Sequence, residues 1–116
     1  MTEYYIVAQS FAAPFFSDTS THWIVAECAE HAINKLRDQY KHPAGLFAAL
    51  CYLDANAQSK GEKPLAKWLC NHEAEKERLT KDLGSYSYRG EGPGKFQIDG
   101  EWHTVENPKG GRFVTV

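Results

Sequence analysis

The sequence predicts a single two-layer α+β domain with a mostly antiparallel sheet, and three stretches of the chain carry this prediction. Over residues 22–40 a short apolar run passes directly into an amphipathic pattern, as in a strand that leads into a helix. Residues 64–83 show a second helical pattern, and residues 85–116 have the alternation and glycine-containing turns of antiparallel strands. We therefore expect two or three helices on one face of a sheet that N-terminal strands and a C-terminal hairpin or meander build.

Length and composition indicate one domain over residues 1–116. Of the 116 residues, 42% are hydrophobic and 24% are charged, which suffices for a core and is unlike a disordered segment. The net charge is −2, with the acidic excess in residues 1–59 and no tight Lys/Arg cluster, so general nucleic-acid binding is not favoured. No apolar run approaches the ~20 residues of a membrane-spanning helix. Three widely spaced cysteines and the lack of a secretory signal predict a reduced, cytoplasmic protein.

The first predicted element is an interior strand over Tyr4–Phe11, because aromatic and β-branched residues occupy both alternate sets of positions. Pro14 and the polar run after it predict that residues 12–21 form a connection. Phe15 and Phe16 are adjacent aromatics within this connection. One of them can plug the edge of the core, or the pair can form an exposed tip that contacts a partner.

The strand predicted next, residues 22–27, is apolar at both alternate sets of positions, which suits burial on both sides or on one side plus an edge. The helix that follows is predicted over residues 29–41, with Ala32, Ile33 and Leu36 on its buried face. Pro43 then ends it. Almost no loop separates strand from helix, so the helix must fold back onto its own sheet.

Residues 46–53 fit two structures equally well. Alanine and leucine at helical spacing predict a helix, whereas an apolar run of this length is equally typical of a buried strand. The helix over residues 64–83 is predicted to begin at Pro64 and to end at Gly84. Its apolar face is predicted to consist of Leu65, Trp68, Leu69 and His72.

A hairpin is predicted around Asp99-Gly100, a pair that suits a type I′ turn. A last strand follows over residues 112–116. We assign Phe96, Ile98, Trp102 and Thr104 to the inner face of the hairpin. The opposite face is then Lys95, Gln97, Glu101, His103 and Val105.

Metal, nucleophilic and phosphate chemistry are each weakly indicated. Cys28 with His31 and Cys70 with His72 form a four-ligand zinc set on paper, but residues two apart on a helix point in different directions. Each cysteine lies in an apolar run that disfavours a thiolate. No motif pairs the acidic residues, and the glycine-rich loops of the C-terminal part connect strands rather than preceding a helix. We expect no catalytic residue, metal or cofactor, and no enzyme activity.

The function that remains is binding. We predict a non-enzymatic protein–protein interaction module, of the kind found among small accessory or inhibitory proteins of phages and other mobile elements, that occludes a nucleic-acid-binding partner. The alternative is a single-strand nucleic-acid-binding domain, in which aromatic and basic groups of the C-terminal sheet stack on bases and contact phosphates. The predicted contact residues are Phe15, Phe16, Tyr86, Tyr88, Arg89, Lys95, Trp102, His103, Lys109 and Arg112.

Overall fold

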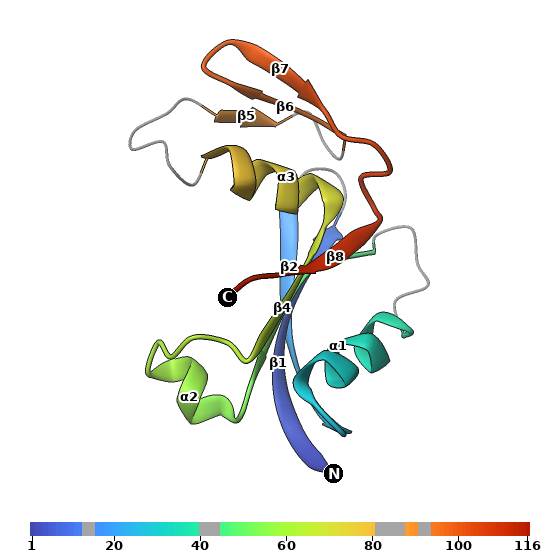
Figure 1. The fold of residues 1–116 in the computed structure, drawn as a ribbon, viewed down its shortest axis with the longest axis vertical. Coiled ribbons are helices and arrows are strands. Elements are labelled where there is room, and N and C mark those ends of the chain that lie inside the picture. The colour runs from blue at the N-terminus through green and yellow to red at the C-terminus, as the bar shows by residue number, and fades with distance from the viewer. Residues whose placement is uncertain (13–15, 40–44, 81–87, 91–93) are drawn as a thin grey trace.

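The computed structural model describes residues 1–12, 16–39, 45–80, 88–90 and 94–116, and it confirms an α+β fold with antiparallel sheets (Figure 1). The described elements are, in order, β1 (Thr2–Ala12), β2 (Phe16–Ala26), α1 (Ala29–Arg37), β3 (Leu46–Tyr52), α2 (Ala55–Ser59), β4 (Ala66–Cys70), α3 (Asn71–Thr80), β5 (Tyr88–Gly90), β6 (Lys95–Ile98), β7 (Glu101–Thr104) and β8 (Gly111–Val114). A five-stranded main sheet has the order β2-β1-β3-β4-β8, and a small sheet has the order β5-β6-β7. Helix α3 lies between the two sheets.

The junction of β2 and α1 has the predicted form. Cys28 stands between them in an extended conformation, and its Sγ accepts a hydrogen bond from the backbone N–H of His31, which caps the helix. Helix α1 buries Ala32, Ile33 and Leu36 fully, as its periodicity predicts. The helix ends at Arg37, short of the predicted residue 41. Residues 40 and 41 lie outside the described residues.

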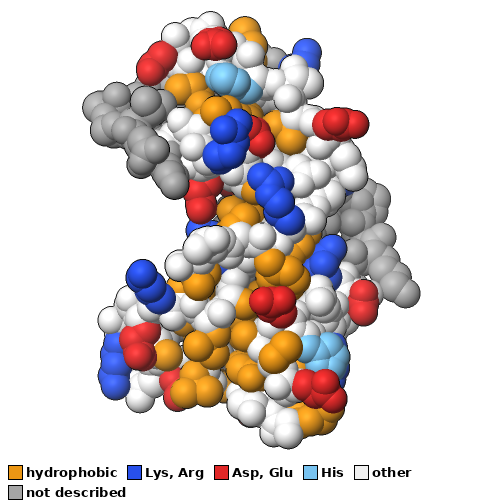
Figure 2. Space-filling model, viewed as in Figure 1, with side chains coloured by type: hydrophobic (Ala, Val, Ile, Leu, Met, Phe, Trp, Pro, Cys, Tyr) orange, Lys and Arg blue, Asp and Glu red, His pale blue; other side chains and the backbone are white. Residues whose placement is uncertain are grey.

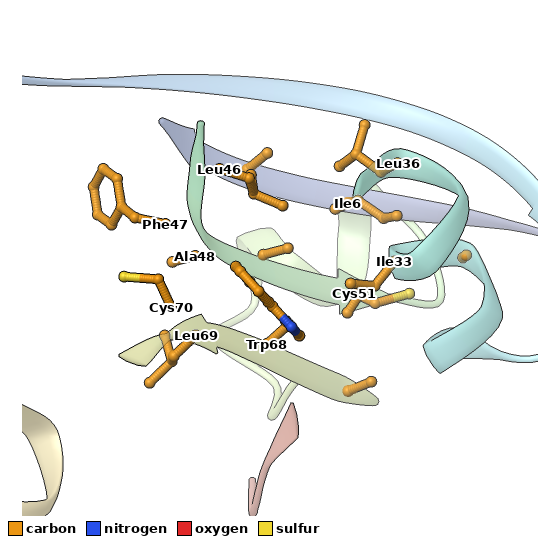
Figure 3. Close-up of a cluster of buried hydrophobic side chains, with 14 of the residues drawn as sticks. Ile6, Ile33, Leu36, Leu46, Phe47, Ala48, Cys51, Trp68, Leu69 and Cys70 are labelled. Carbon is orange, nitrogen blue, oxygen red and sulfur yellow. The ribbon is translucent and has the colours of Figure 1, made fainter. Parts of the chain in front are cut away.

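The main core lies between α1 and the main sheet. In Figure 3 the side chains of Ile33 and Leu36 point from α1 toward Ile6 of β1 and Trp68 of β4. The guanidinium of Arg37 lies over the Trp68 ring, 4.5 Å from its centroid, and so covers the outer side of this core. Strand β1 lies between β2 and β3, which confirms the prediction of an interior first strand.

The predicted connection over residues 12–21 is wrong for most of its length. Strand β2 begins at Phe16 and pairs with β1 along its whole length, from Ala12 opposite Phe16 to Thr2 opposite Ala26. Threonine and serine lack the apolar character of a buried strand, but the edge position of β2 leaves one of its sides in water, so the polar run is tolerated. Pro14 and Phe15 lie outside the described residues.

Residues 46–52 form strand β3, which decides between the two structures left open by the sequence. β3 pairs antiparallel with β1 on one side and with β4 on the other, and most of its side chains are buried. A short helix, α2, follows it and is capped by Asp54, whose Oδ1 accepts from the Ala57 N–H at 2.8 Å.

The predicted helix over residues 64–83 is wrong in its first half. Residues 66–70 form β4, and only at Asn71 does the chain enter a helix, α3, which is described to Thr80. Leu65, Trp68 and Leu69 were read as a helical face, but a five-residue run of this kind fits either period. Pairing with β3 on one side and β8 on the other decides for the strand. Residues 81–84 lie outside the described residues.

The predicted hairpin is confirmed, and both turn residues have the positive φ of a type I′ turn, 48° at Asp99 and 87° at Gly100. Its strands form the small sheet with β5, whereas β8 joins the main sheet beside β4. The small sheet has its own core, in which Leu79 of α3 packs against the buried residues Phe96, Ile98 and Val105.

The predicted inner face of the hairpin is wrong for β7. A two-residue turn places Ile98 opposite Glu101 and Phe96 opposite His103, so His103 shares the inner side with Phe96. Trp102 lies opposite Gln97 and is 45% exposed. Directly opposed residues share a face in an antiparallel pair, so the register follows from the turn length. Val105, assigned to the outside, is buried.

The tightest contact in the main sheet is at Gly111 of β8. A Cβ at this position would overlap the ring of Trp68 and lie 2.5 Å from the Leu69 carbonyl oxygen. We predict that Gly111→Ala lowers the free energy of unfolding by about 2 kcal/mol or more, because β8 must move away from β4. The exposed Thr115→Ala is the control and should change it by less than about 0.5 kcal/mol in urea unfolding. Equal stability of the two variants would contradict the close approach of β8 to β4.

Candidate functional site

A groove of about 470 Å³ lies where α3, β7 and the start of β8 meet. It is open to solvent along one side and mixes apolar with charged side chains. The residues that line it are Asn71, Glu75, Arg78, Leu79, Trp102, His103, Thr104, Val105, Glu106 and Arg112. The β7–β8 connection returns the chain from the small sheet to the main sheet here, so the groove lies at the junction of the two sheets.

Asn71 and His72, the first two residues of α3, hold this junction together. The Asn71 N–H donates to the Gly110 carbonyl at 2.5 Å, and its side-chain Nδ2 donates to the Asn107 carbonyl at 2.9 Å. The His72 N–H donates to the Pro108 carbonyl at 3.4 Å. These N–H groups have no partner inside the helix, so the β7–β8 connection satisfies them.

His72 also ties α3 to the small sheet through its ring. It is 3% exposed, and its Nδ1 accepts a hydrogen bond from the Gly94 N–H at 3.0 Å. Its ring meets Phe96 edge-on, and Phe96 in turn stacks on His103, with 5.3 Å between ring centroids in both contacts. Burial lowers the pKa of His72, against a smaller opposing effect of Glu73 and a small lowering effect of Lys76. A neutral ring is what the bond from Gly94 requires.

The charges in the groove are only partly neutralised by the protein itself. Arg78 forms an ion pair with Glu75 on the same helix. The Arg112 guanidinium instead donates to the Asn71 Oδ1 at 3.2 Å, and it forms no ion pair with any described carboxylate. Trp102 projects from β7 into the same groove with 45% of its surface exposed. A cation without a described carboxylate partner and an exposed indole, both lining one groove, are the features of the groove most suited to binding.

Three of the ten predicted contact residues meet in this groove, namely Trp102, His103 and Arg112. Arg89, Lys95 and Lys109 are exposed but do not line it. Phe16 and Tyr88 lie in β2 and β5, with side chains outside the described part of the structure, and Phe15 and Tyr86 lie outside the described residues altogether. The contributions of Asn71, Glu75 and Arg78 were missed, because nothing in the sequence relates α3 to the hairpin.

The cysteines are placed as packing and capping residues. Burial raises the pKa of Cys51 to about 12, with a smaller contribution from Cys28, and burial also raises the pKa of Cys70. Cys28 is exposed and caps α1. Among the described residues, no group of three or more His, Cys, Asp and Glu side chains is arranged to hold a metal ion.

A second feature, missed by the sequence reasoning, is an exposed apolar face on the main sheet. In β1 and β2 the residues that alternate with the core-facing ones are Tyr5, Trp23 and Val25; Trp23 is 52% and Val25 46% exposed. The rings of Tyr5 and Trp23 lie 5.0 Å apart. Tyr52 of β3 lies opposite Tyr5 and is half-buried. Figure 2 shows hydrophobic side chains gathered between α1 and α2 on the visible face of the molecule.

The signal for this face was present in the sequence. Residues 22–27 are apolar at both alternate sets of positions, and an edge strand with one uncovered face satisfies that pattern as well as a fully buried strand does. Large contiguous apolar surface of this kind marks contact sites.

No family model, curated protein or solved structure matches this chain. Across the described part of the chain, none of the helices has the length and apolar character needed to span a membrane.

The buried His72 predicts a specific pH dependence of stability. Its native pKa lies below the 6.5 of an accessible histidine, so the unfolded chain binds a proton more readily, and stability falls as the pH drops below about 6.5. Urea unfolding should give a smaller free energy of unfolding at pH 5.5 than at pH 7.5. In His72→Gln, whose side chain at position 72 cannot titrate, the difference between the two pH values should be smaller. The same loss in both proteins would contradict the assignment of a neutral, buried His72.

Proposed function

We propose that this chain is a non-enzymatic protein–protein interaction module and that its groove binds an extended segment of a partner protein. The observation that carries the proposal is that one groove is lined both by the exposed Trp102 and by Arg112, which lacks a carboxylate partner among the described residues. Tryptophan and arginine are the residues most enriched among those that dominate binding energy at interfaces. The segment that fits carries an apolar or aromatic side chain against Trp102 and an acidic side chain against Arg112.

The charge balance of the groove favours a protein segment over single-stranded nucleic acid. Two arginines line it, but so do Glu75 and Glu106, and Glu75 already neutralises Arg78. A phosphate backbone needs a run of uncompensated cations, which this groove does not offer. An acidic side chain next to an apolar one needs only the one guanidinium, that of Arg112, which no described carboxylate neutralises.

Exposed acidic residues in the N-terminal half support the finer proposal that the partner itself binds nucleic acid. Within the described residues, Glu3, Asp18, Glu27, Glu30 and Asp38 are exposed and none is in an ion pair. Glu3 lies opposite Val25 near the end of β2, and Glu27 and Glu30 follow at the β2–α1 junction, so these three carboxylates lie at one end of the main sheet. An acidic end of this kind can contact the basic groove of a nucleic-acid-binding protein and compete with nucleic acid for it. We place this inhibitory, accessory role in a phage or other mobile element, and in the reduced cytoplasm, where the three free cysteines stay unpaired.

Selection of a short random-peptide library on the folded protein tests the proposal directly. The enriched peptides should carry an acidic residue next to an aromatic or aliphatic one. In fluorescence anisotropy, Arg112→Ala and Trp102→Ala should each weaken binding of a labelled winning peptide about tenfold or more. The matched controls outside the groove, Arg89→Ala and Trp23→Ala, should change it less than about twofold.

Labelled oligothymidine provides the competing outcome in the same assay. Binding of oligothymidine that weakens steeply with added salt and is lost in Trp102→Ala would replace the protein-binding proposal with the single-strand alternative. If the affinity for the peptide is unchanged by both groove substitutions, the binding site lies elsewhere and the assignment of the groove is refuted.

A further inference from the structure

Strand β2 is an unusually long open edge of the main sheet. It runs for 11 residues, from Phe16 to Ala26, and within the described structure β1 is its only neighbouring strand. Edge strands of this length are normally protected by lysine, proline, bulges or covering segments. β2 contains no lysine, arginine or proline, and Asp18 is its single carboxylate. In the described part of the chain, its outer backbone groups face no second strand and can pair with one.

Among the described residues, α1 covers this edge at its C-terminal end. The Lys35 ammonium of α1 donates to the Val25 carbonyl oxygen at 2.7 Å. Because alternate residues of a strand direct their backbone groups to the same edge, residues 17, 19, 21 and 23 present theirs beside that of Val25. The open length thus extends from the start of β2 to residue 24.

We propose that two copies of this chain pair antiparallel through β2, about a two-fold axis at Ser20. A self-pairing confined to residues 16–24 has its centre at residue 20, which sets residue 17 opposite 23 and residue 19 opposite 21 of the second copy. Each such pair exchanges two hydrogen bonds, about eight in all, and the two main sheets become one continuous sheet. In both copies the odd-numbered residues direct their backbone groups to the outer edge. This register sets odd-numbered residues opposite each other, so their N–H and C=O groups meet.

The composition of the edge and of the adjacent face is compatible with a second copy. The paired stretch has a single formal charge per chain, so two copies meet with little repulsion. Trp23, which is 52% exposed, lies opposite residue 17 of the second copy and diagonal to its Thr19, whose methyl group it can cover. The exposed apolar faces of the two sheets are then contiguous. The groove adjoins β8, which is at the edge of the main sheet opposite β2, so the pairing uses a different edge from the proposed peptide site.

Sedimentation velocity of the full chain tests the association. The wild type should sediment with twice the mass of one chain at micromolar concentration. Thr21→Pro removes an outward N–H donor from each copy and should weaken the dimer at least tenfold, while the matched Thr104→Pro, on β7, should leave it unchanged. Circular dichroism of each variant checks that it is folded. A wild-type monomer throughout, or a Thr21→Pro dimer of unchanged affinity, overturns the proposal.

A cysteine crosslink tests the register without depending on the stability of the proline variants. In a Cys28→Ser background, where serine keeps the helix cap and the remaining thiols are buried, Ser20→Cys places two thiols across the two-fold axis. The Cα atoms of a non-hydrogen-bonded antiparallel pair lie about 4.5 Å apart, within the range of a disulfide. Mild oxidation should yield a covalent dimer with Ser20→Cys and not with Thr19→Cys in the same background. Equal crosslinking of the two, or none with Ser20→Cys, overturns the proposed pairing.

Discussion

The arrangement of the two sheets depends on the direct passage of β4 into α3 at Asn71 and His72. With no loop between strand and helix, the first turn of α3 has unsatisfied N–H groups close to the end of the sheet, and the β7–β8 connection supplies their acceptors. The Asn71 side chain binds the same connection, and the His72 ring binds Gly94 and Phe96 of the small sheet. Two residues therefore fix the position of the small sheet, the return of β8 to the main sheet and the walls of the groove.

This constraint explains why the groove has the composition it has. Asn71 lines the groove and accepts a hydrogen bond from Arg112, which holds the guanidinium in place without neutralising it. The small sheet leaves Trp102 exposed on its outer face, because its inner positions are taken by Phe96 and His103. Rigid elements thus present a cation and an indole at a fixed separation, an arrangement suited to selective binding of a segment that carries both complementary groups.

The sequence predicted the parts of the fold that local chemistry determines. Asp99-Gly100 determines the hairpin, and the apolar stripe on α1 determines its buried face. β4 was misread as helix because the spacing of Trp68 and Leu69 fits both periods, and only the strands on either side decide between them. For the site, Trp102, His103 and Arg112 were named, but Trp102 and His103 were assigned to the wrong faces of the hairpin. The groove residues of α3 are distant in sequence, and no local pattern connects them to the hairpin.

Amide hydrogen exchange in an Asn71→Ala variant tests most directly whether these two residues hold the sheets together. Exchange reports local opening of individual hydrogen bonds. The account predicts faster exchange at the Gly110 and Gly94 amides and along β8, with protection in β1 and β3 close to that of the wild type. Unchanged exchange at Gly94 and β8, or a uniform loss across β1 and β3 as well, would contradict it.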